Sequence, residues 1–172
     1  MTLKRAFLWT WIGGLVLFAI VIALSLPLIL TAVPGGIGDH QAAGSAAEVD
    51  RIQMAWRMAG LWNQAAIAMI ADLVFIGVYG VGCMLGGRYF MTSSTSRVRM
   101  LGLTALFTGF TFLATDYIET VCQFIQLVGF EGDDLLAGLA AAVRPVKMAA
   151  WILATLAIAI ALIMARKSDR TA

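Results

Sequence analysis

Residues 104–126 read TALFTGFTFLATDYIETVCQFIQ and decide the fold class of this chain. The stretch is long enough to span a bilayer as an α-helix, which takes about 20 mostly apolar residues. Asp116 and Glu119 nevertheless stand near its middle. A carboxylate at the centre of a membrane helix costs about 3 kcal/mol on insertion scales, so the segment is only marginally stable in lipid by itself. We therefore expect its polar residues to face other helices or water inside the protein.

Those polar residues share one side of the predicted helix, because positions three, four and seven apart project in the same direction. The polar side carries Asp116, Glu119, Thr120 and Gln123. The opposite side is apolar and suits lipid or packed neighbours. This division predicts a helix whose polar face points inward.

Composition extends the membrane interpretation to the whole chain. Of its 172 residues, 61% are hydrophobic and 13% are charged, and that charged share is about half of what soluble proteins carry. A net charge of +2 without a basic, aromatic-interleaved face argues against nucleic-acid binding. The length allows one integral membrane domain, residues 1–172.

Four apolar stretches predict an all-α membrane protein with four transmembrane helices in an up-down bundle. They cover approximately residues 6–33, 61–87, 100–129 and 138–165. A signal peptide is the alternative for the first stretch, but its 28 uncharged residues far exceed the 7–15 of a signal's apolar region. Pro27 is expected to kink the outer end of this helix. The fourth helix can begin either before Pro145 or at it.

Two shorter features accompany the spans. Gly82 and Gly86 form a GxxxG motif, for which tight helix packing is favoured over a dimer seam. Ser45 precedes Glu48 by three residues, a capping-box spacing that predicts a short helix, which either lies at the interface in the first outer loop or extends the second span outward. His40, the only histidine, lies in the Gly-rich stretch before this helix and is expected to be solvated.

Basic residues predict the orientation in the membrane. One side holds Lys4, Arg5, Arg88, Arg97, Arg99, Arg166, Lys167 and Arg170, whereas the other holds only Arg51 and Arg57 with most of the acids. By the positive-inside rule, both the N-terminus and the C-terminus of this multi-pass chain face the cytoplasm.

Charged residues of three predicted helices fall into one layer. Counted from the outer helix ends at about 1.5 Å per residue, they lie about 9 to 19 Å inside; they are Asp72, Asp116, Glu119, Arg144 and Lys147. Because unpaired charges in lipid are costly, we expect the two bases to face the three acids. One surplus carboxylate then remains, with a raised affinity for protons. A proton, a cation or a cationic headgroup would balance it.

The candidate binding cluster therefore consists of Asp72, Tyr79, Asp116, Glu119, Gln123, Arg144 and Lys147. Two alternatives compete with a binding role: the charges serve only helix packing, or Lys147 reaches the membrane surface because Pro145 opens its helix. No catalytic residue, metal site or cofactor is predicted. Cys83 and Cys122 fall at opposite depths, and no CxxC or His-rich spacing is present.

Two segments carry a family resemblance. DLVFIGVYG (residues 72–80) and TDYIETV (residues 115–121) together resemble four-span bacterial inner-membrane proteins with intramembrane acids. The resemblance covers the middle half of the chain, implies a bacterial inner (plasma) membrane and brings no assigned activity. Four spans with intramembrane acids are also similar in architecture to sterol-isomerase-like membrane proteins, although no catalytic residue can be matched.

Three functions from different classes fit these observations. The favoured one is a binding or transport-related module for a proton, a cation or an amphiphile. The second is a non-catalytic accessory or assembly subunit of a larger membrane complex. The third is an intramembrane lipid-modifying enzyme with Asp116 or Glu119 as general acid or base, which no nucleophile–base pair or nucleotide motif supports. Expected partners are membrane lipids and either a larger membrane complex or a second copy of the chain.

Overall fold

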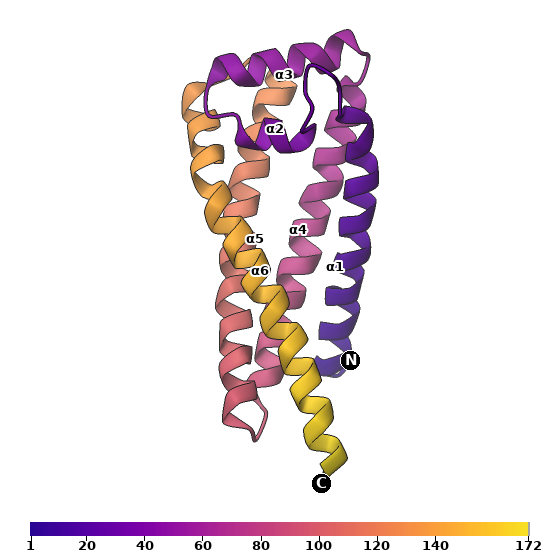
Figure 1. Cartoon of the computed structure of the whole chain (residues 1–172), viewed down its shortest axis with the longest axis vertical. Helices are drawn as coiled ribbons and strands as arrows, with labels where there is room; N and C mark the ends of the chain where they lie inside the picture. The colour runs from indigo at the N-terminus through magenta and orange to yellow at the C-terminus, as the bar shows by residue number, and fades with distance from the viewer. Residues whose placement is uncertain (172) are drawn as a thin grey trace. The chain divides into compact units, whose positions relative to one another are not determined.

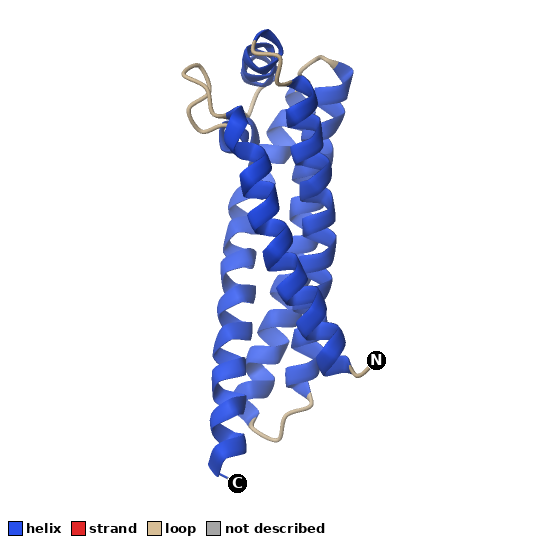
Figure 2. Cartoon of the chain, turned by 90° about the vertical axis from the view of Figure 1, so that its right-hand side faces the viewer, coloured by secondary structure: helices blue, strands red, loops and turns tan. Residues whose placement is uncertain are grey.

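The computed structural model describes the backbone of residues 1–171 and the side chains of residues 1–166. This part of the chain is helical, with no strand beyond an isolated bridge between Leu30 and Val33 (Figure 2). The elements are α1 (Leu3–Ser25), the 3-10 helix η1 (Leu26–Leu28), α2 (Ile37–Ala42), α3 (Ala46–Met58), α4 (Trp62–Met91), α5 (Ser96–Gly129) and α6 (Asp134–Thr171) (Figure 1).

Four helical stretches are long and apolar enough to cross a membrane. They are Leu3–Leu28, Trp62–Met91, Ser96–Gly129 and Asp134–Arg166. Four such helices are what a small polytopic membrane protein requires, so the structure supports the membrane class predicted from composition.

The helix ends differ from the apolar runs in three places. α1 ends at Ser25, because Pro27 belongs to η1 and cannot donate to the preceding turn, so Pro27 ends this helix rather than kinking it. α4 and α5 extend beyond their apolar cores and leave only residues 92–95 as a connection. α6 begins at Asp134, well before Pro145, which lies inside it.

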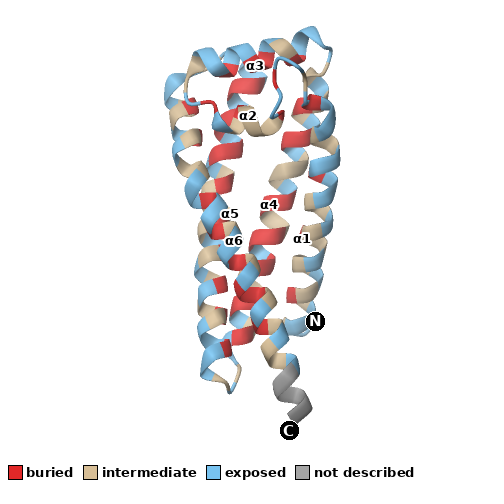
Figure 3. Ribbon diagram, viewed as in Figure 1, coloured by how far each residue is buried: buried red, intermediate tan, exposed pale blue. Residues whose placement is uncertain are grey.

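The chain divides into two compact units. Unit 1 comprises Met1–Leu15, Ile76–Ala114 and Val146–Ala172, and unit 2 comprises Val16–Phe75 and Thr115–Pro145. Each of the four long helices contributes residues to both units. Buried and exposed positions alternate along these helices (Figure 3).

Helices in unit 1 approach one another through glycine. A Cβ atom at Gly82 would lie 2.7 Å from the backbone N of Trp11, and one at Gly87 would lie 2.6 Å from the backbone N of Leu106. Gly86, the other glycine of the motif, meets an aromatic ring of α1. The GxxxG motif therefore serves packing within the chain, the interpretation favoured from the sequence.

Unit 2 contains an apolar core beneath α3. Its fully buried centre is Trp56, whose Nε1–H donates to the Leu28 carbonyl at 2.9 Å. The other buried members of the core are Leu28, Val33, Ala43, Val49, Ile52, Ala65, Ala68, Met69, Leu127 and Ala137. The core thus joins residues from α3, α4, α5, α6 and the loops between them.

α3 begins as its capping box predicts. Ser45 Oγ accepts the Glu48 N–H at 3.4 Å, and Glu48 Oε2 accepts the N–H of Gly44 at 3.0 Å. The Ser45 hydroxyl thus satisfies a backbone donor that a helix start leaves without a partner, and the Glu48 carboxylate bonds the residue just before the N-cap.

Two hydrogen bonds join α3 and its N-terminus to the α5–α6 turn and the first residue of α6. Asp50 Oδ1 accepts the Gly132 N–H at 2.6 Å, and Asp134 Oδ1 accepts the Ala46 N–H at 2.7 Å. We call these two contacts the α3 clasp.

Candidate functional site

The polar side of α5 is buried. Buried residues on this side are Asp116, Glu119, Thr120, Gln123 and Gln126, whereas Ile118, Val121 and Ile125 are exposed. A soluble helix would show the reverse pattern, because water favours polar surface. Exposed aliphatic side chains around a buried polar face suit a helix surrounded by lipid, as the sequence predicts.

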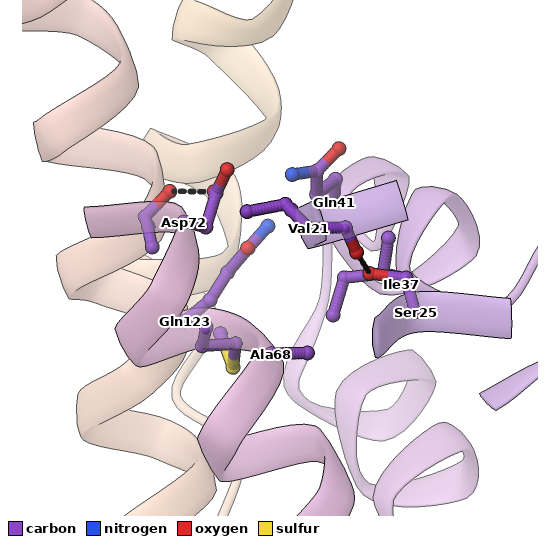
Figure 4. A pocket seen from close by; sticks show the side chains of 9 residues that line it. Val21, Ser25, Ile37, Gln41, Ala68, Asp72 and Gln123 are labelled. Carbon is purple, nitrogen blue, oxygen red and sulfur yellow. Dashed lines mark hydrogen bonds between the residues drawn. The ribbon is translucent and has the colours of Figure 1, made fainter. Parts of the chain in front are cut away.

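Part of this polar side borders a small cavity in unit 2 (Figure 4). The cavity has a volume of about 30 Å³, which is room for one or two water molecules. It is lined by Val21, Ser25, Ile37, Gln41, Ala68, Met69, Asp72, Thr120 and Gln123. We call it the Asp72 cavity, because Asp72 is the one ionisable side chain in its wall.

A hydrogen bond across the wall joins α4 to α5. Thr120 Oγ1 donates to Asp72 Oδ2 at 3.1 Å, the upper dashed contact in Figure 4. Gln123, one turn further along α5, points into the same space (Figure 4). Tyr117 supports this pairing from the neighbouring turn, since its hydroxyl donates to the Leu73 carbonyl at 3.1 Å. The Asp72 carboxylate is therefore held in place by α5.

The short helix α2 covers the cavity. Ile37 and Gln41 contribute to the lining, and Gln123 Nε2 donates to the His40 carbonyl at 3.3 Å. His40 Nε2 lies 3.2 Å from Gln53 Nε2 of α3. Side-chain amides of α5 and α3 thus fix α2 from both sides.

His40 corrects one expectation from the sequence, because it is fully buried rather than solvated. Its ring packs on Trp56 with centroids 5.2 Å apart. Burial lowers the pKa of His40 to about 4, so the ring is neutral at pH 7. With Nε2 accepting from Gln53, the ring proton sits on Nδ1, which has no hydrogen-bond partner among the described residues.

The predicted cluster is divided between the two units. Asp72, Asp116, Glu119, Gln123 and Arg144 belong to unit 2, and Tyr79 and Lys147 belong to unit 1. Only Asp72 and Gln123 of the unit 2 group line the cavity. Arg144 is half-buried on α6.

The two unit 1 residues are both buried. The Tyr79 hydroxyl lies 2.6 Å from Thr155 Oγ1 of α6, and its ring meets the edge of Phe112 at 5.4 Å. Pairing of Lys147 with the acids stays a prediction.

Several lining residues were outside the predicted cluster. Ser25 and Gln41 lie in segments without a periodic pattern, and Thr120 was placed on the polar face without a site role. A polar residue within an apolar span is the sequence signal that would have added Thr120 to the predicted cluster. No comparable signal marks α2, because six residues are too few to show helical periodicity.

The donor set restricts the chemistry of the cavity. It offers one carboxylate, hydroxyls from Ser25 and Thr120, and amides from Gln41 and Gln123. Among the described residues, no three His, Cys, Asp or Glu side chains are grouped to hold a metal ion. One negative charge with neutral oxygen ligands can balance a proton or a monovalent cation.

Comparison with protein-family models, curated protein sequences and solved structures gives no match for this chain. The family resemblance noted in the sequence therefore stays a prediction, and the functional argument rests on the geometry of the Asp72 cavity.

Proposed function

We propose that this chain is a membrane protein that binds a proton or a small monovalent cation at Asp72. The observation that carries the proposal is a small cavity with half-buried Asp72 in its wall, where Thr120 donates a hydrogen bond to the Asp72 carboxylate. Ionisable side chains inside membrane spans commonly mark paths for protons and ions, because an idle charge there would be costly.

The volume of the cavity selects among the ligands considered from the sequence. Sites for small organic molecules usually measure about 300–1,000 Å³. The Asp72 cavity measures about 30 Å³, which suits a protonated water or a dehydrated ion rather than an amphiphile. A proton or a cation is therefore favoured over an amphiphile as the ligand.

Charge also favours a singly charged ligand. Asp72 supplies one negative charge to the cavity wall, and the other polar residues that line the cavity are uncharged; they are Ser25, Gln41, Thr120 and Gln123. Asp116 lies one turn before Thr120 on the buried side of α5, so it offers a further acceptor along the same helix face.

Asp72→Asn is expected to abolish ligand-dependent stabilisation. A ligand at a hundred times its Kd stabilises a folded protein by about 2.7 kcal/mol. For the wild type in nanodiscs, we expect the thermal midpoint to rise when Li⁺, Na⁺ or K⁺ is added at constant ionic strength, or when the pH is lowered from alkaline values to pH 6.5. For Asp72→Asn, we expect no such rise. The measurement is nanodisc thermal unfolding across these series.

Asp133→Asn is the matched control, because Asp133 is an exposed carboxylate of unit 2 that lines neither this cavity nor any other described hollow, and asparagine keeps the oxygen that accepts the Leu136 N–H. It should respond as the wild type does. An undiminished response in Asp72→Asn, or equal loss in both variants, would remove Asp72 as the binding group.

We also propose that the protein lies in a bacterial inner membrane with both termini in the cytoplasm. The support is the asymmetry of eight basic residues against two across the predicted loops. In a background without Cys83 and Cys122, a membrane-impermeant maleimide should label Ala59→Cys in intact cells. Ser94→Cys should require permeabilisation first. The reverse pattern would invert the topology.

A further inference from the structure

A second hollow lies on the surface of unit 2, outside the Asp72 cavity. It has a volume of about 270 Å³ and is lined by Asp50, Gln53, Met54 and Arg57 of α3 with Phe130 and Glu131 of the α5–α6 turn. We call it the α3 groove. Its volume approaches the lower limit for sites that hold small organic groups.

Arg57 is held in this groove by aromatic rings. Its guanidinium carbon lies 4.7 Å from the centroid of Phe130 and 5.5 Å from that of Trp62. The two rings stack on each other at 4.6 Å and 11°. Such cation–π contacts use the face of the guanidinium and leave its N–H edge available. Among the described residues, this edge makes no hydrogen bond or ion pair.

The backbone at Phe130 is adapted to this arrangement. Its φ of 61° lies in the left-handed region, which costs a non-glycine residue on the order of 1 kcal/mol. Phe130 follows the last residue of α5, where glycine is the common choice. Phe130 instead occupies this position at that cost, and its ring lies beside Arg57.

Carboxylates complete the groove. Glu131 is exposed and has no hydrogen-bond or ion-pair partner among the described residues. One carboxylate oxygen of Asp50 accepts the Gly132 N–H, which fixes the orientation of the Asp50 side chain. The groove thus presents an oriented cation and two carboxylates, together with the exposed apolar side chains of Met54 and Phe130.

We propose that the α3 groove binds a ligand that carries both a phosphate and a primary ammonium, as the headgroup of an ethanolamine phospholipid does. Arg57 would receive the phosphate through its N–H edge, a geometry that guanidinium favours. Glu131 and Asp50 would receive the ammonium, which donates three hydrogen bonds. Met54 and Phe130 would contact the glycerol end of the ligand.

The position of the groove along the chain favours a lipid as the source. Phe130 and Glu131 directly follow the candidate span that ends at Gly129, and Arg57 shortly precedes the span that begins at Trp62. Residues at span ends lie at the depth of lipid headgroups. This site is separate from the Asp72 cavity, so it does not rest on the function proposed above.

Lipid retention tests the proposal. The purified protein is equilibrated with equimolar phosphatidylethanolamine, phosphatidylcholine and phosphatidylglycerol, and the retained lipids are counted by native mass spectrometry. We expect retention of the ethanolamine lipid over both others, because choline cannot donate to a carboxylate and glycerol has no cation. Arg57→Gln should lower this retention about tenfold, as loss of one charge-assisted pair implies. Glu131→Gln should lower the preference for ethanolamine over choline about threefold.

Arg51→Gln is the charge-matched control, since Arg51 lies on the same helix but bonds the Ala32 carbonyl outside the groove. It should retain lipid as the wild type does. Glycerophosphoethanolamine, which has no acyl chains, is the second probe; full displacement of lipid by it would assign the groove to a soluble phosphate–ammonium compound. Equal retention of the three lipids, or equal effects of Arg57→Gln and Arg51→Gln, would overturn the proposal. Because Glu131 is exposed and has no partner, its variant tests the site even if Arg57→Gln does not fold.

Discussion

Gly87→Ala is expected to destabilise the protein by about 2 kcal/mol and to lower its thermal midpoint by roughly 6 °C. The new methyl group would lie 2.6 Å from the Leu106 backbone N and 2.7 Å from the Gly102 carbonyl O. Backbone atoms cannot rotate away as a side chain can, so the helices must separate, at a cost of about 3 kcal/mol. The higher helix propensity of alanine offsets about 1 kcal/mol of this. Thermal unfolding in detergent or nanodiscs measures the difference, at about 2–4 °C per kcal/mol.

Gly13→Ala is the matched control for that experiment. Gly13 lies in α1 of the same unit, and a Cβ atom there would meet nothing within 4 Å. It should gain the helix propensity of alanine without a clash, so its thermal midpoint should stay level or rise slightly. Equal behaviour of the two variants would show that the close approach of α4 and α5 at Gly87 is absent in the membrane.

Acidification is expected to destabilise the protein through His40. The pKa of His40 is about 4 in the folded protein and about 6.5 in an unfolded chain. Above pH 6.5 the ring is neutral in both states and its stabilising contribution is complete. As the pH falls from 6.5 to 4, only the unfolded state binds the proton, so the free energy of unfolding decreases by about 1.4 kcal/mol per pH unit and by about 3 kcal/mol in total.

His40→Gln separates this effect from that of other titrating groups. Glutamine is similar in size and keeps a hydrogen-bonding side chain beside Gln53, but it does not titrate. Denaturant or thermal unfolding between pH 7.5 and pH 4 should show a steeper loss of stability for the wild type than for His40→Gln. Parallel pH profiles would mean that the ring is not held neutral by burial.

The membrane class and the inward polar face of α5 could be predicted because both depend on local sequence. Apolar runs of span length identify membrane helices without knowledge of tertiary contacts. The side shared by Asp116, Glu119 and Gln123 follows from helical spacing alone. The start of α3 was likewise predicted from Ser45 and Glu48, since a capping box is complete within four residues.

The Asp72 cavity and the α3 groove could not be predicted, because each is assembled from distant segments. The cavity combines residues of α1, α2, α4 and α5, and the groove combines α3 with a turn reached more than 70 residues later. The burial of His40 depends on α2, which has no sequence signature of its own. The apolar runs also did not predict the helix ends, because a helix can continue through arginine and serine residues after the apolar run has ended.

The α3 clasp has a consequence for the order of biosynthesis. Its two hydrogen bonds join residues 82 and 88 positions apart in sequence. At roughly 5–20 residues per second of translation, α3, which ends at Met58, is complete about 4–15 s before Gly132 and Asp134 have been synthesised. During that interval the core around Trp56 can pack on Leu28 and on the start of α4, but it still lacks Leu127 and Ala137. The α3 clasp therefore forms only after the third span has been synthesised. Truncation of the chain before residue 132 should leave α3 more exposed to protease.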